Sequence, residues 1–81
     1  MRKMTFQEAK ELLRGDRLTC IHGFTHPNMG LIFSKGRKYH ITAVRNYMNG
    51  DIDYAVGAIK EDGGFWLTSS QLRRMFVKEE K

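Results

Sequence analysis

Apolar and polar side chains alternate most clearly in the middle of the chain, where residues 31–44 read LIFSKGRKYHITAV. An apolar segment and a Ser-Lys-Gly turn come first, and Tyr39, Ile41 and Ala43 then alternate with polar or charged residues. Such alternation places one set of side chains on a core face of a β-strand and the other on a solvent face. The pattern therefore predicts a strand over residues 37–44 that follows a tight turn.

The N-terminal segment follows a helical spacing instead. The apolar residues that recur at this spacing are Phe6, Ala9, Leu12 and Leu13. Thr5 and Glu8 have the spacing of a capping box, in which each side chain bonds to a backbone N–H of the first helical turn. We therefore predict an amphipathic helix over residues 5–13, within a helical segment 5–14 that Gly15 ends.

Short apolar runs between turn residues predict the remaining elements. They are a strand over 17–21, a long loop over 22–30, a loop over 45–53, a strand over 54–59, a tight reversal over 61–64, a strand over 65–67, a helical turn over 68–71, a last strand or short helix over 72–77, and a charged tail over 78–81. The chain is short enough for one domain, residues 1–81, which we expect to be mainly β with an N-terminal α-helix.

Composition adds that the domain is basic. Fourteen Lys and Arg against nine Asp and Glu give a net charge of +5, which raises association with acidic partners in general. The one cysteine allows no internal disulfide, and no apolar run is long enough to span a membrane as a helix. These features predict a soluble, cytoplasmic protein.

Three segments resemble the SH3-like small β-barrels. Residues 31–36 resemble the diverging turn of SH3 domains, residues 20–24 lie where those domains carry Ala-Leu-Tyr-Asp-Tyr, and residues 66–72 resemble their last conserved segment. The Lys-Gly-x-x-Tyr-x-Ile pattern of residues 35–41 is similar to short SH3-like proteins of bacteriophages. Over residues 17–77, the resemblance implies an SH3-like antiparallel β-barrel of about five short strands, to which the N-terminal helix is added.

The resemblance fails at the positions that bind proline-rich ligands. SH3 domains hold polyproline between aromatic rings, whereas the corresponding positions here are His22, Phe24, Tyr47 or Tyr54, Thr68 and Gln71. Too few aromatic rings remain to hold prolines. The similarity to phage proteins instead implies a phage-encoded factor that binds a host protein, including a defence protein, and inhibits or redirects it.

Candidate chemistry is sparse. Cys20, His22 and His26 have the spacing C-x-H-x₃-H of a partial zinc site, but tetrahedral zinc needs a further ligand, and His40 is the only other histidine. We favour Cys20 as a core residue and the histidines as loop residues. A buried thiol forms little thiolate, and a small filled barrel offers no water-excluding cleft. We therefore expect no enzyme, no cofactor and no metal site.

We expect function to lie on the outer loops, because the barrel fixes their ends and leaves their tips free. The predicted partner-binding residues of the 22–30 and 45–53 loops and nearby are Phe24, His26, Met29, Tyr47, Met48 and Trp66, with Arg37, Lys38 and Arg45 steering an acidic protein. Interleaved rings and cations leave nucleic-acid binding as the alternative. The helix either covers one edge of the barrel or packs on a second copy, so monomer and homodimer both stay open.

Overall fold

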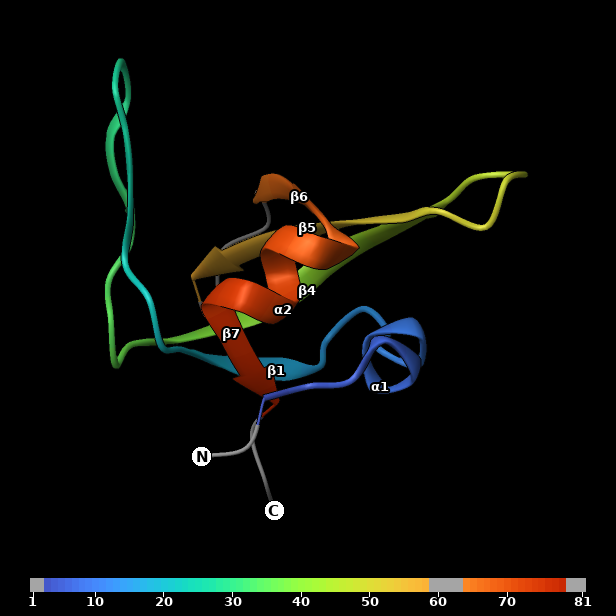
Figure 1. The fold of residues 1–81 in the computed structure, drawn as a ribbon. Helices are drawn as coiled ribbons and strands as arrows, with labels where there is room; N and C mark the ends of the chain where they lie inside the picture. The colour runs from blue at the N-terminus through green and yellow to red at the C-terminus, as the bar shows by residue number, and fades with distance from the viewer. Residues whose placement is uncertain (1–2, 59–63, 79–81) are drawn as a thin grey trace.

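The computed structural model describes residues 3–58 and 64–78 (Figure 1). Its elements are α1 (Phe6–Lys10), β1 (Arg17–Cys20), β2 (Phe24–His26), β3 (Gly30–Phe33), β4 (Lys38–Asn46), β5 (Ile52–Ala58), β6 (Phe65–Thr68), α2 (Ser69–Met75) and β7 (Phe76–Lys78). The prediction of a mainly β fold with antiparallel strands is confirmed. Most of the predicted reversal at 61–64 and of the tail at 78–81 lies outside the described residues. Neither described helix is long and apolar enough to cross a membrane.

The strands form a five-stranded antiparallel sheet in the order β6-β5-β4-β1-β7 and a separate β2–β3 hairpin. Within the described residues the larger sheet is open, because its outer strands β6 and β7 are joined by α2 and are not hydrogen-bonded to each other. The predicted closed barrel is therefore not observed. The short linking turn expected after β6 is a helix of seven residues, which separates β6 from β7 along the chain.

One face of the sheet carries the core. Strand pairing places Leu18 beside Tyr39 and Tyr54 beside Leu67, and all four side chains are buried. The predicted inward position of Tyr39 is confirmed. The Tyr54 hydroxyl donates a hydrogen bond to the carbonyl of Ala9, which ties α1 to the sheet. Both helices therefore cover the core face, and the other face of β4, β5 and β6 is left to solvent.

Phe33 is the centre of a cluster of aromatic rings at one end of this core. Its ring centroid lies 5.0 Å from that of Phe76, 5.1 Å from that of Tyr39, 6.2 Å from that of Phe65 and 6.5 Å from that of Phe24. Most of these pairs meet edge to face, the arrangement that the charge distribution of aromatic rings favours. The cluster fastens the β2–β3 hairpin to the sheet by side chains alone.

The N-terminal helix begins as predicted but ends early. The capping box of Thr5 and Glu8 is confirmed. The helix nevertheless stops at Lys10, and the N–H of Glu11 already bonds to carbonyls in the last turn. Leu13 is 69% exposed, so the prediction that it continues the apolar stripe is wrong. Gly15 has a φ of 96° and serves a later turn rather than the helix end.

Two further predictions differ from the structure. The loop expected over 22–30 contains β2 and the start of β3, which pair from Phe24–Phe33 to His26–Gly30. The helical turn expected over 68–71 is the first half of α2, which runs to Met75 from a capping box formed by Thr68 and Gln71. Only the last residues of the segment 72–77 form a strand, β7.

Candidate functional site

The loops predicted to form one binding surface lie apart. The tip of the β2–β3 hairpin and the turn between β4 and β5 project at opposite ends of the molecule in Figure 1. Each end carries exposed apolar side chains, which are Met29 and Leu31 on the hairpin and Tyr47 and Met48 on the β4–β5 turn, and Trp66 is exposed on β6. The predicted site residues therefore divide between two surfaces, and neither includes all of them.

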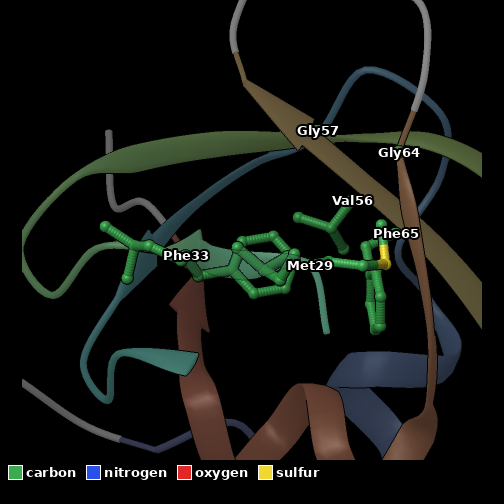
Figure 2. A pocket seen from close by; sticks show the side chains of 8 residues that line it. Met29, Phe33, Val56, Gly57, Gly64 and Phe65 are labelled. Atoms are coloured by element: carbon green, nitrogen blue, oxygen red, sulfur yellow. The ribbon is translucent and has the colours of Figure 1, made fainter. Parts of the chain in front are cut away.

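The first surface is an open pocket of about 260 Å³ between the hairpin and the ends of β5 and β6. We call it the hairpin pocket; its lining residues are Met29, Leu31, Ile32, Phe33, Val56, Gly57, Gly64 and Phe65. Figure 2 shows Met29 and Phe33 from the hairpin side, with Val56 and Phe65 from the sheet. Met29 and Leu31 are both 65% exposed at its rim, whereas Phe33 and Val56 are buried at its base. The pocket thus offers an apolar base, and the unbranched side chain of Met29 at its rim can adapt to a bound group.

Phe24 and His26 hold the hairpin in place. The Phe24 ring is 5.6 Å from that of Phe65, and the His26 ring is 6.2 Å from it. The Nδ1 atom of His26 accepts hydrogen bonds from the backbone N–H groups of Asn28 and Met29 and so shapes the hairpin tip. These two predicted binding residues support the pocket, while the predicted Met29 borders it directly.

The second surface lies on the solvent face of the sheet. The Arg45 guanidinium carbon sits 4.4 Å from the centroid of the Trp66 ring, and Trp66 is 41% exposed. Beside them the Tyr47 hydroxyl donates a 2.8 Å hydrogen bond to a carboxylate oxygen of Asp53. Met48 is fully exposed at the tip of the turn. We call Arg45, Tyr47, Met48 and Trp66 the Arg45–Trp66 surface.

The other predicted cations lie near the opposite end of β4. Arg37 stands 5.9 Å from the centre of the Tyr39 ring, and Lys38 is the first residue of the strand. At about 3.3 Å per residue, Arg37 and Arg45 are roughly 25 Å apart along the strand. Arg45 alone among the three predicted steering cations therefore belongs to the Arg45–Trp66 surface.

Cys20 lies in the core, as predicted. Its side chain is 1% exposed, and its thiol donates to the carbonyl of His22. Burial raises the pKa of the Cys20 thiol, and the contact with the His22 backbone lowers it by less. No group of three His, Cys, Asp or Glu side chains that could hold a metal ion occurs among residues 3–58 and 64–78. His22 therefore contacts the Cys20 thiol through its backbone carbonyl and not through its ring.

The raised pKa of Cys20 predicts a loss of stability in alkali. Above its unfolded pKa, near the ordinary 9.0, the unfolded chain releases a proton that the folded chain retains, so the free energy of unfolding falls as pH rises. The slope from this thiol reaches at most about 1.4 kcal/mol per pH unit. Urea unfolding between pH 7 and 10 measures it. Cys20→Ala should show a shallower fall than the parent; equal slopes would contradict the assignment.

Sequence reasoning missed the sheet side of the hairpin pocket. Val56 and Phe65 are paired neighbours on β5 and β6, and both face the hairpin. The sequence shows that Val56 and Phe65 are apolar. It does not show that the hairpin packs against them, because that position depends on ring contacts between segments far apart in the chain. The sequence identifies Leu31 only as part of an apolar segment, and nothing in that segment indicates that its side chain is exposed.

Comparison with known proteins gives no relative from which a function could be carried over. No protein-family model, no curated protein and no solved structure matches the chain.

Proposed function

We propose that this chain is a small, non-enzymatic binding module that recognises a protein, and that the hairpin pocket receives an apolar side chain of its partner. The observation that carries this proposal is the pocket itself: an apolar base lies open to solvent, under a rim formed by two large exposed apolar residues, Met29 and Leu31. Adaptable methionine rims and contiguous exposed apolar groups are features of protein-binding surfaces.

The chemistry of the lining supports binding rather than catalysis. Every side chain that lines the hairpin pocket is apolar or absent, so the lining supplies no acid, base or nucleophile. Complete burial of a leucine- or phenylalanine-sized side chain contributes about 1.5–3 kcal/mol. One inserted side chain could therefore anchor a partner, and neighbouring contacts would add specificity.

The order of the connections supports an SH3-like arrangement opened by α2. A long excursion that contains the hairpin separates β1 from β4, a turn of medium length joins β4 to β5, and one short helix separates β6 from β7. In this arrangement the hairpin pocket replaces the proline-binding rings of SH3 domains. The resemblance of residues 35–41 to short phage proteins supports a bacterial host protein as the partner, whose activity the chain would inhibit or redirect.

The hairpin pocket predicts which substitutions weaken partner binding. Tagged protein would first capture its partner from a bacterial lysate, and the purified pair would then be measured by calorimetry. We expect Met29→Ser and Leu31→Ser each to weaken binding by roughly 30-fold, the value of a central apolar contact. Leu13→Ser is the matched control, because Leu13 is equally exposed but lies outside the pocket.

Two results would contradict the proposal. The first is a partner whose affinity Leu13→Ser reduces as much as Met29→Ser does. The second is retention of nucleic acid that falls steeply as salt is raised, since counterion release gives phosphate binding a strong salt dependence. Apolar anchoring should instead survive raised salt.

A further inference from the structure

The Arg45–Trp66 surface holds a guanidinium group against an indole ring. Strand pairing sets Arg45 opposite Asp53 and Trp66 opposite Ala55, on the same face of the sheet. Ala43 pairs with Ala55 on that face, so small side chains lie between the arginine strand and the indole. The indole therefore has room to lean across β5 and meet the guanidinium at 4.4 Å. This cation–π contact restricts the arginine side chain and reduces the entropy that a bound ligand would otherwise remove.

The hydrogen-bond donors of this guanidinium are available. Across residues 3–58 and 64–78, no carboxylate or carbonyl oxygen is hydrogen-bonded to Arg45. Asp53, its cross-strand neighbour, accepts the Tyr47 hydroxyl instead. The guanidinium lies over the indole ring, and a guanidinium carries N–H groups in the fork that matches a carboxylate. An exposed, oriented and unpaired fork is a recognition element for an anion.

We propose that the Arg45–Trp66 surface binds a side-chain carboxylate of an acidic protein segment, with an apolar neighbour of that carboxylate resting on Tyr47 and Met48. The net charge of +5 favours an acidic partner. Asp53 lies opposite Arg45 and Asp51 two residues before it, and these charges repel a polyanionic phosphate backbone more strongly than a single carboxylate. The fully exposed Met48 and the half-exposed Tyr47 then provide the apolar contact.

The proposed site is independent of the hairpin pocket. Phe65 lines that pocket, whereas its neighbour Trp66 points to the other face of the sheet, because side chains alternate along a strand. Either site can therefore fail experimentally without the other. Met29→Ser, which damages the pocket, should leave binding at the Arg45–Trp66 surface unchanged.

Trp66 is the only tryptophan, so its fluorescence reports this surface directly in the intact chain. The probe is a capped peptide of repeated Glu-Leu-Ser triplets, compared with the same peptide in which Gln replaces Glu and with a single-stranded oligothymidylate. We expect a saturable change in Trp66 emission with the Glu peptide. The Gln peptide should bind at least about tenfold more weakly, because an arginine–carboxylate pair is charge-assisted.

Arg45→Lys tests the stacked fork while it keeps the charge. We expect this variant to bind the Glu peptide about tenfold more weakly, since lysine offers no planar fork. Arg37→Ala is the matched control: it removes a ring-stacked cation at the far end of β4, and affinity should change less than about twofold. Equal binding of the Glu and Gln peptides, no saturable change, tighter binding of the oligothymidylate, or full affinity in Arg45→Lys would each overturn the proposal. The comparison of the Glu and Gln peptides uses the unsubstituted chain, so it tests the proposal even if Arg45→Lys does not fold.

Discussion

Phe33→Ala should remove a large part of the stability of this domain. The side chain is 1% exposed and contacts four other aromatic rings, so its truncation leaves a cavity that rigid rings on four strands cannot fill. Truncation of a buried phenylalanine costs about 3–5 kcal/mol. At about 0.05–0.15 kcal/mol per residue, the 81-residue chain has roughly 4–12 kcal/mol in total. Urea unfolding followed by circular dichroism measures the loss, and the melting temperature should fall by at least about 12 °C.

Leu31→Ala is the matched control for this loss, because Leu31 lies two residues away on the same strand but is 65% exposed. An exposed position should change the free energy of unfolding by less than about 0.5 kcal/mol. Similar losses in both variants would show that the burial of Phe33 is not the cause of its stabilising effect. A small loss in Phe33→Ala would show that the aromatic cluster does not hold the hairpin to the sheet.

Local signals in the sequence predicted local structure well. The capping box at Thr5 depends on side chains three residues apart, and the structure confirms it. The same kind of signal was present at Thr68 and Gln71, where it marks the start of α2, and it could have predicted a full helix there. The alternation identified the strand and the buried positions of Tyr39 and Ile41, because that pattern is written in consecutive residues. The prediction that Ala43 is also inward is wrong, because a bulge between Ile41 and Ala43 reverses the alternation and Val44 packs on the core instead.

Features that depend on distant contacts could not be predicted in this way. The short β2 is stabilised by the packing of Phe24 against Phe65, and nothing in the run Phe-Thr-His indicates that contact. The closed barrel was predicted from a resemblance, whereas the described sheet is open between β6 and β7, and the helix that joins them is longer than the predicted turn. The sequence analysis placed Met29 and Trp66 on one surface for the same reason, since only the arrangement of the strands shows that Met29 borders the hairpin pocket and Trp66 contacts Arg45 on the other face of the sheet.

Gly64→Ala should also destabilise the domain strongly, because Gly64 lies against the backbone of Val56 on β5 beside the hairpin pocket. A Cβ atom at Gly64 would lie 2.9 Å from the backbone nitrogen of Val56, 3.0 Å from its carbonyl carbon and 2.7 Å from Oγ1 of Thr42. Backbone atoms of a central, paired strand cannot move aside as the end of a flexible side chain can. We therefore expect β6 to shift away from β5 and the free energy of unfolding to fall by about 2–3 kcal/mol.

Two comparison variants isolate the backbone contact as the cause. Gly23→Ala places its Cβ no closer than 3.3 Å to another atom, so it should cost less than about 1 kcal/mol. Thr42→Ala removes the nearest side-chain atom, but the Thr42→Ala/Gly64→Ala pair should stay destabilised, because the Val56 backbone remains in place. Full recovery in that double variant, measured by urea unfolding, would mean that the Thr42 hydroxyl alone opposes the new methyl group. Gly64 and Val56 also line the hairpin pocket. A substitution that moves β6 away from β5 should therefore both destabilise the sheet and change the shape of the proposed binding site.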